Sequence, residues 1–523
     1  MAGFADVLLR GLALCGQAAA IGGVLFALVV LKPALRPRPE LSPLMGRLLI
    51  LVAAGAAAVT VGQLLSLAVQ QMALSGGQGW PIRLVLGTAY FQASALRVLI
   101  CGAIVVGALR LRRRPDAPAW WTVMVALTVA LAATAAAISH AAARLEHGGA
   151  LFIVDAVHQY AASVWVGGLM HLTAAAYGRG GEAWPALLLK RFSALALTAV
   201  GSLVVAGLAL TIPYVGGVPA LLGTSYGVMV LTKVAILAGL LALGAMNFFG
   251  VRRLSAASDV GSARLRRFVE VEFGLGVTAL FVAASLTSLP PAADVIADRA
   301  TLAEVGARFS PRWPTLASPA IAEMPVDDPD APRTTADRAW SEFNHNVAGL
   351  FVLAMGLLAS LYATGRARWA RHWPLIFFGL AVFLLIRNDP GAWPLGPLGF
   401  WESWAYPAVL QHRVFVLLVF VFAAFEWMVR AGRLPSGRAA LVFPLLCAVG
   451  GGLLLAHSHA SLNLKEEFLT EVTHAPLGLV GMLVGWGRWL ELRLPSPETR
   501  LPRWLWSGAL ATAGVLLLLY RES

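Results

Sequence analysis

The feature that most constrains this chain is a succession of apolar segments, each about as long as a helix that crosses a bilayer. Such a helix takes about 20 predominantly apolar residues. We identify about fourteen of these segments in the 523 residues. They lie near residues 7–31, 48–70, 94–110, 120–142, 152–176, 193–212, 227–249, 269–289, 343–363, 373–387, 409–429, 439–457, 470–487 and 503–520. The sequence therefore predicts an all-α fold, that of a polytopic integral membrane protein.

The composition agrees with that prediction and excludes several other classes of protein. Apolar residues make up 59% of the chain and charged residues 13%, whereas soluble domains average about 45–50% and about 25%. A single soluble core stops growing at about 250–300 residues, so it could not bury this excess. Soluble enzymes, nucleic-acid-binding proteins and disordered chains are therefore excluded. The net charge of +13 reflects basic residues in cytoplasmic loops rather than a nucleic-acid partner.

A polar segment divides the predicted helices into two groups. Residues 290–342 are rich in acidic residues and proline and contain no apolar run long enough to cross a membrane. We expect an eight-helix membrane domain over residues 1–289, an extramembrane linker over 290–342 and a six-helix, histidine-bearing membrane domain over 343–523.

Basic residues orient these helices, because short cytoplasmic loops are enriched in Lys and Arg. Most of the 40 Lys and Arg residues fall in alternate short loops, beginning with the loop between the first two segments. Those loops include Lys32 to Arg47, Arg110 to Arg114, Arg179 to Arg191, Arg252 to Arg267, Arg366 to Arg371, Arg430 to Arg438 and Arg488 to Arg503. We therefore expect these loops to be cytoplasmic, and both termini and the linker to lie on the outer side.

The histidines gather on that outer side. Only His171 and His372 of the ten histidines lie toward the cytoplasm in this topology. The others lie at outer helix ends or in outer loops, namely His140, His147, His158, His345, His412, His457, His459 and His474. Imidazole is the commonest neutral metal ligand and also ligates haem. The alternative interpretation is that histidines are simply tolerated at the membrane interface.

Two hairpins combine histidines with a carboxylate. In the first, His140 and His147 are followed by Asp155-Ala-Val-His158; in the second, His457 and His459 are followed by Glu471-Val-Thr-His474. Residues three apart share a helix face, so each carboxylate can ligate a metal beside the imidazole or fix its tautomer. An acid in a first helical turn also compensates the helix dipole. With His345 and His412, these residues are the predicted metal ligands, and nitrogen and carboxylate ligands suit Cu(II) or Zn.

Other chemistries find no support in the sequence. Cys15, Cys101 and Cys447 lie inside apolar segments and form no C-x-x-C pair, so neither a disulfide framework nor a thiolate metal site is indicated. We find no hydrolase triad, phosphate-binding loop or nucleotide motif. The sequence predicts no catalytic residues and no enzymatic activity.

One stretch is similar to a known family. Residues 138–172, ISHAAARLEHGGALFIVDAVHQYAASVWVGGLMHL, resemble the copper resistance protein D (CopD) family of bacterial inner-membrane proteins. Supporting motifs are Trp165-Val-Gly-Gly168 and Gly223-Thr-Ser-Tyr-Gly227, followed by Lys233 and Asn247. The resemblance covers about residues 1–290. It implies copper import or copper resistance in the inner (cell) membrane, alongside periplasmic copper carrier proteins, with His140, Asp155 and His158 as carried-over ligands.

Copper transport or delivery through outer-face sites is therefore the leading hypothesis. The alternative is a haem-binding membrane cytochrome that transfers electrons through outer-face histidines, and a scaffold for assembly that binds neither copper nor haem is a third reading. The six-helix region lies outside the resemblance. Its histidines could form a second copper site or belong to a module that assembles copper enzymes, and we expect them to form a site separate from the first.

Overall fold

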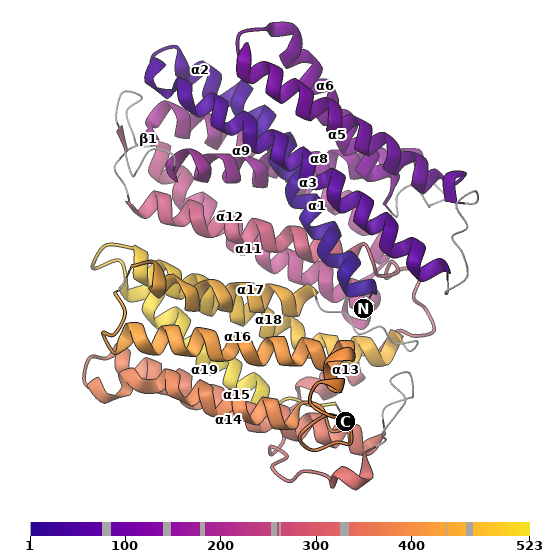
Figure 1. Ribbon diagram of the computed structural model, residues 1–523, viewed down its shortest axis with the longest axis vertical. Helices are drawn as coiled ribbons and strands as arrows, with labels where there is room; N and C mark the ends of the chain where they lie inside the picture. Colours follow the sequence, from indigo (N-terminus) through magenta and orange to yellow (C-terminus); the bar gives the residue numbers. More distant parts are fainter. Residues whose placement is uncertain are drawn as a thin grey trace. The chain divides into compact units, whose positions relative to one another are not determined.

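The computed structural model describes residues 2–75, 85–139, 148–177, 184–252, 259–260, 263–324, 334–435, 437–456 and 464–522. These residues are almost entirely helical (Figure 1). The long α-helices are α1 (Ala2–Leu25), α3 (Ser42–Ser75), α5 (Ala89–Arg113), α6 (Pro118–Ala137), α8 (Gly148–Tyr177), α9 (Ala186–Val215), α11 (Ser225–Arg252), α12 (Ala263–Leu286), α14 (Thr335–Ala363), α15 (Ile376–Arg387), α16 (Pro407–Arg430), α17 (Val442–Ala456), α18 (Leu464–Arg493) and α19 (Arg500–Leu518).

Shorter elements connect them. A π-helical turn, η1 (Phe26–Leu31), and the short α2 (Lys32–Leu35) continue α1. The remaining short helices are η2 (Pro39–Leu41), α10 (Val218–Gly223), α13 (Leu302–Phe309), η3 (Ile321–Glu323), η4 (Arg368–Leu375), η5 (Glu402–Ala405) and η6 (Arg438–Leu441). Two short strands, β1 (Trp184–Pro185) and β2 (Asp259–Val260), pair antiparallel.

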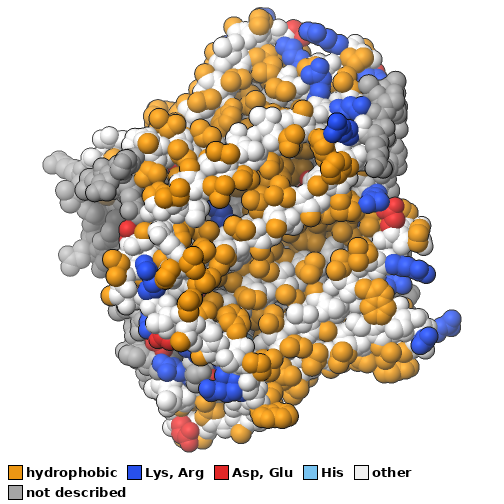
Figure 2. Space-filling view, turned by 180° about the vertical axis from the view of Figure 1, so that it is seen from behind, with side chains coloured by type: hydrophobic (Ala, Val, Ile, Leu, Met, Phe, Trp, Pro, Cys, Tyr) orange, Lys and Arg blue, Asp and Glu red, His pale blue; other side chains and the backbone are white. Residues whose placement is uncertain are grey.

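The prediction of an all-α membrane protein is confirmed. Among the described residues, thirteen helices are long and apolar enough to cross a membrane. The predicted segment 152–176 is also helical, as α8, but it does not count among the thirteen. His158, Gln159 and His171 interrupt its apolar character. Hydrophobic side chains cover much of the face seen in Figure 2, with Lys and Arg near its edges, as expected of a surface in contact with lipid.

The chain divides into two compact units, which we describe separately. One unit comprises residues 2–218 and 229–294. Its central helix, α1, packs against α3, α8 and α12. Glycines allow the helices to approach closely: a Cβ atom built on Gly167 of α8 would lie only 1.8 Å from the carbonyl oxygen of Ala18. Small residues at such crossings are typical of helix packing in membranes.

A buried arginine is held inside this first unit by neutral partners. Arg97 of α5 donates to the side-chain oxygen of Gln17 at 2.7 Å and to the carbonyl oxygen of Leu131 at 3.2 Å. Gln17 in turn donates to the Ser163 hydroxyl at 3.2 Å. The side chain is only 2% exposed, so these hydrogen bonds replace the water that a guanidinium requires. The network links α1, α5, α6 and α8.

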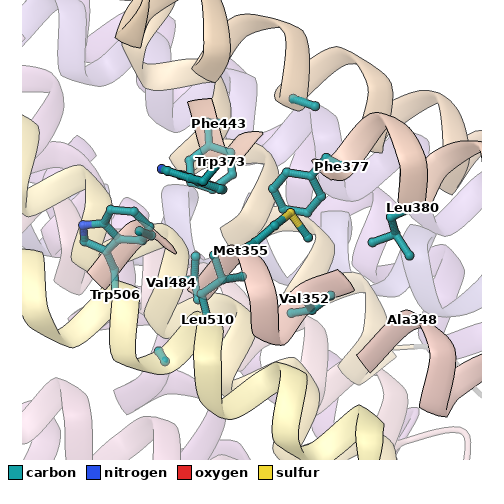
Figure 3. Close-up of a cluster of buried hydrophobic side chains, with 13 residues drawn as sticks. Ala348, Val352, Met355, Trp373, Phe377, Leu380, Phe443, Val484, Trp506 and Leu510 are labelled. Atoms are coloured by element: carbon teal, nitrogen blue, oxygen red, sulfur yellow. The ribbon is translucent and has the colours of Figure 1, made fainter. Parts of the chain in front are cut away.

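The other unit comprises residues 219–228 and 295–523. Its core is aromatic: Trp373 and Trp506 are buried at a ring separation of 5.8 Å, and Phe377 and Phe443 pack beside them (Figure 3). Helix α19 packs against both α14 and α18. This packing brings His345 of α14 and His474 of α18 to Tyr520, just beyond the end of α19.

A network of buried charges lies beside this aromatic core. The Glu426 carboxylate of α16 accepts from Arg430 at 2.6 Å and pairs with Arg488 of α18 at 3.0 Å. Arg488 also pairs with Glu491 at 2.6 Å, and Glu491 accepts from the Trp506 indole of α19 at 2.6 Å. The network therefore joins α16, α18 and α19 in the half of the unit that we predict to face the cytoplasm.

Candidate metal centre

The structure brings together two of the predicted ligands in the second unit. The rings of His345 in α14 and His474 in α18 lie with their centroids 5.7 Å apart and nearly perpendicular, at 79°. The two residues are 129 positions apart in the sequence, since 474 − 345 = 129. Two imidazoles at this separation can approach one metal ion from two sides, since metal–nitrogen bonds are about 2.0–2.1 Å long.

Backbone hydrogen bonds orient both rings in the same way. Nδ1 of His345 lies 2.8 Å from the carbonyl oxygen of Ser341, and Nδ1 of His474 lies 2.7 Å from that of Thr470. A carbonyl can only accept, so in each ring Nδ1 carries the proton. The lone pair then resides on Nε2 in both histidines. An Nδ1–H bond to a backbone carbonyl is the usual support of a metal-ligating histidine, because it fixes the tautomer and the ring plane.

Tyr520 holds the pair from the end of α19. Its ring stacks on His345 at 3.9 Å and 22° and lies 5.6 Å from the His474 ring. The Asn346 amide donates to the carbonyl oxygens of Leu517 and Tyr520, at 3.2 Å in both cases, which ties this segment to α14. Because α19 packs on both α14 and α18, the tyrosine is fixed against both histidines. The pair is therefore preorganised.

Glu471 lies one helical turn before His474. It is buried, at 5% exposed, and one carboxylate oxygen has no hydrogen-bond partner among the described residues. The Ser225 side chain is a hydrogen-bond partner of this carboxylate. A buried carboxylate oxygen without a donor is costly, and a cation would satisfy it. Among the described residues, however, Glu471 does not join the two histidines in a group arranged to hold a metal ion.

His412 has a different partner. Its Nδ1 lies 2.8 Å from a carboxylate oxygen of Asp389, at the loop after α15. No contact in the described part of the chain joins His412 to His345 or His474. The carboxylate–imidazole pair resembles the support given to metal ligands, but it is separate from the histidine pair as the structure has it.

In the first unit, Asp155 and His158 of α8 contact different neighbours. Asp155 accepts from the Ser139 hydroxyl at 2.6 Å and from the Gln159 amide at 2.9 Å. His158 directs Nδ1 to the carbonyl oxygen of Leu203 in α9 at 3.1 Å. Its ring lies beside Gly207, where an added Cβ would be 3.1 Å from Cε1. Because the carbonyl of Leu203 can only accept, Nδ1 of His158 carries the proton and the lone pair lies on Nε2.

A lysine shares this environment. Lys233 of α11 interacts electrostatically with both Asp155 and His158. Attraction to Asp155 helps to hold the ammonium group in the membrane domain. A bound metal ion would be repelled by the same ammonium group, so the charge of Lys233 opposes binding at His158.

The remaining predicted ligands, His140, His147, His457 and His459, lie outside the described residues. Within the residues that are described, no group of three or more His, Cys, Asp or Glu side chains is arranged to hold a metal ion. Of the predicted histidine ligands that the structure describes, His345 and His474 are the two whose rings lie beside each other.

Sequence reasoning did not identify Tyr520 or Asp389 as part of either arrangement. Asp389 could have been found, because it follows the tenth apolar segment on the same predicted side as His412. Tyr520 gave a weaker signal, an aromatic residue at the end of the last segment, which is common at membrane interfaces.

Comparison with known proteins supports the resemblance stated above. Residues 186–286 match the family described as copper resistance protein D, which confirms the predicted resemblance over that stretch. The copper transport protein CutJ of Bacillus subtilis (strain 168) is 30% identical over 251 residues, 45% of this chain and 44% of CutJ. The chain thus matches less than half the length of that relative. No solved structure matches the chain. These matches support a copper-related membrane function.

Proposed function

We propose that this protein captures copper at the periplasmic face of the bacterial inner membrane and transports or delivers it inward. The observation that carries the proposal is the pair of His345 and His474, whose rings lie 5.7 Å apart and whose hydrogen bonds place the proton on Nδ1 and the lone pair on Nε2 in both. Imidazole nitrogen suits copper in either common oxidation state better than it suits Mg or Ca. The similarity to a copper resistance family and to a copper transport protein selects copper among the metals that histidine binds.

The predicted topology places this pair at the outer surface. His345 lies in the first half of α14 (Thr335–Ala363) and His474 in the first half of α18 (Leu464–Arg493). Both helices begin on the side that the basic loops predict to be periplasmic. Copper is the transported substrate here, so the site must release it as well as bind it. A two-histidine site meets that requirement better than a closed four-ligand structural site would.

We propose that Asp155 and His158 belong to a second, separate outer-face site in the first unit. The two units each contain a histidine with its lone pair on Nε2 and an acidic residue three positions before it. Lys233 acts on His158 electrostatically, and its positive charge would repel a metal ion, so we expect this site to bind copper more weakly than the histidine pair. Weaker binding would suit transfer rather than storage.

The activity is transport or delivery rather than catalysis, with no catalytic residues. A periplasmic copper carrier protein is the partner that the resemblance implies. Both termini and residues 290–342 are then periplasmic.

Copper accumulation in cells tests the function. Cells that produce the double variant His345→Ala, His474→Ala should lose most of the copper uptake or copper-dependent phenotype conferred by the wild-type chain, at an equal level of protein in the membrane. His372→Ala serves as the matched control, because His372 of η4 contacts Arg371 and Trp427 on the predicted cytoplasmic side. Unchanged copper accumulation in the double variant would contradict the proposal.

The same purified protein separates copper from haem. A copper protein contains copper and lacks the intense Soret band, whereas a membrane cytochrome shows that band. If the wild-type protein shows a Soret band and the double variant does not, the two histidines ligate haem and the copper proposal is wrong.

A further inference from the structure

Two buried glutamates lie near the beginning of α12 in the first unit. Glu270 is 6% exposed and Glu272 is 4% exposed. Both lie within the part of α12 that is long and apolar enough to cross a membrane, close to the arginines of Arg264 to Arg267 that we predict to be cytoplasmic. A carboxylate in such surroundings is costly unless it is paired. The partners of each glutamate therefore show how that cost is met.

Glu270 is paired with cations. Its carboxylate accepts from Arg267 and lies 3.8 Å from the guanidinium of Arg266. It also accepts from the Tyr177 hydroxyl of α8 at 3.2 Å. These contacts compensate Glu270 as an ion and turn it toward α8.

Glu272, two residues later, has a neutral partner instead. The side-chain amide of Asn247 in α11 donates to its Oε1 atom. Its Oε2 atom faces Gly244 of α11, where an added Cβ would lie 3.9 Å away. Within the described residues, the Glu272 side chain forms no ion pair, and Asn247 is its one hydrogen-bond partner. The carboxyl group therefore lies between α11 and α12 without a compensating cation.

The ionisable groups of α8, which packs on α12, are directed elsewhere. Tyr177 donates to Glu270, as described above. His171 directs Nδ1 to the carbonyl oxygen of Gly167 in its own helix, at 2.8 Å. Neither side chain has an interaction with Glu272.

The charged groups of α1 and α11 also leave Glu272 alone. Asp6 and Arg10 of α1 pair with each other at 2.7 Å, near the far end of α12. Lys233 and Arg252, the basic residues of α11, form no ion pair with Glu272. Among the described residues, the surroundings of this carboxyl group are therefore uncharged.

An amide partner suits a carboxyl group that changes its protonation state. The amide NH₂ of Asn247 can donate to either form of Glu272, and the amide oxygen can accept from the O–H of the protonated form. A guanidinium has donors only, so the arginines beside Glu270 support the ionised form alone. A buried carboxyl group that lacks a cation is neutralised by binding a proton. The two glutamates are thus equipped for different tasks.

We propose that Glu272 is a proton-binding site that exchanges one proton with the cytoplasmic side in each cycle of copper transport, a role that rests on the proposed function. The carboxylate takes up a proton to become the neutral acid and later releases the same proton, and no electron is transferred. Because Asn247 and Glu272 belong to different helices, a shift of α11 against α12 changes the hydrogen bonding of the carboxyl group. Movement of these helices and proton exchange are therefore coupled. Ionisable residues in such positions are typical of proton relays in transporters.

Infrared spectroscopy of the purified full-length protein in lipid tests the proton site directly. A protonated carboxyl group has a C=O band that an ionised carboxylate lacks. With EDTA present to remove copper, the wild-type spectrum should gain such a band as the pH is lowered through the physiological range. Glu272→Gln should lose this pH-dependent component, whereas the matched control Glu270→Gln should retain it. Identical pH-dependent spectra of wild type and a folded Glu272→Gln variant would overturn the proposal.

A second variant provides another route if Glu272→Gln does not fold. Asn247→Leu removes the amide and keeps a side chain of similar size, so the C=O band of Glu272 loses its hydrogen bonds and should shift to higher frequency. An unshifted band in a folded Asn247→Leu variant would show that the titrating carboxyl group lies elsewhere, and would reject this site.

Copper uptake by proteoliposomes tests the coupling. Copper is added outside, and a pH gradient is imposed in one direction and then in the other. Wild type and Glu270→Gln should transport at different rates under the two gradients, and Glu272→Gln should lose this difference. Equal rates of the wild type under both gradients would contradict coupling to a proton.

The infrared assay contains no copper, which separates the proton site from the proposed function. The double variant His345→Ala, His474→Ala should lose copper uptake and keep the band of Glu272. If wild type takes up no copper but Glu272→Gln removes the band, copper transport is wrong and the proton site stands. If uptake requires the two histidines but no band depends on Glu272, the proton site is wrong and copper transport stands.

Discussion

Substitution of Glu426 in α16 should destabilise the second unit strongly. It is 1% exposed, and its carboxylate contacts two buried guanidinium groups, those of Arg430 at 2.6 Å and Arg488 at 3.0 Å. Glu426→Gln retains the shape of the side chain and removes the charge. Breaking a buried ion pair in this way costs about 3–5 kcal/mol, because the remaining charges stay buried without compensation.

A double variant separates the charge from the packing. In Glu426→Gln, Arg430→Met, one of the uncompensated cations is removed, while Arg488 keeps its contact with Glu491 at 2.6 Å. The double variant should therefore recover part of the stability that Glu426→Gln loses. Since Arg430 also lies over the rings of Trp373 and Trp506, the recovery will be incomplete.

Thermal unfolding in one detergent provides the assay. For a unit of this size each kcal/mol shifts Tm by about 2–4 °C, so Glu426→Gln should lower Tm by about 6–20 °C. Glu323→Gln, an exposed carboxylate in η3, should change it by less than about 1 °C. A Tm within about 2 °C of wild type for Glu426→Gln, or a double variant less stable than the single one, would refute the argument that charge compensation sustains this network.

Three further predictions follow from other parts of the molecule. Lys465, together with Thr301, lowers the pKa of Glu304 from 4.5 to about 2. The contribution of this contact to stability is therefore fully present above pH 4.5 and is lost as the pH falls through about 2. A carboxyl-carbon NMR titration of Glu304 with its midpoint near 4.5 would contradict this. Gly167→Ala should destabilise the first unit by about 1–3 kcal/mol, because its Cβ would meet the Ala18 carbonyl, whereas Gly201→Ala, with open space around it, should not; equal folded yields and Tm values would argue against the close crossing of α1 and α8. Reporter fusions after Arg114 and after Asp328 should give cytoplasmic and periplasmic signals, and the same signal from both would overturn the topology.

The sequence predicts helices well where composition alone decides them. Long apolar segments place the helices because a backbone in lipid must satisfy its own hydrogen bonds. The sequence analysis predicted no helix in the linker, but the linker contains α13, whose Thr301 and Glu304 form a capping box. That pattern, Thr-x-x-Glu before an apolar residue, is visible in the sequence.

The partners of the candidate ligands could not be predicted in the same way. Histidines at the outer ends of α14 and α18 follow from the topology, but their approach to 5.7 Å depends on both helices packing against α19. Tyr520 stacks on His345 for the same reason. Which helices become neighbours in a membrane depends on small residues and local packing. The apolar pattern of one sequence does not reveal which pairs meet.

The central claim, capture of copper by His345 and His474, is tested most directly by copper analysis of the purified full-length protein loaded with copper and freed of excess metal. Wild type should retain copper, and the double variant His345→Ala, His474→Ala should lose about one equivalent, while any copper held near His158 remains. Full retention of copper by a folded double variant would contradict the account.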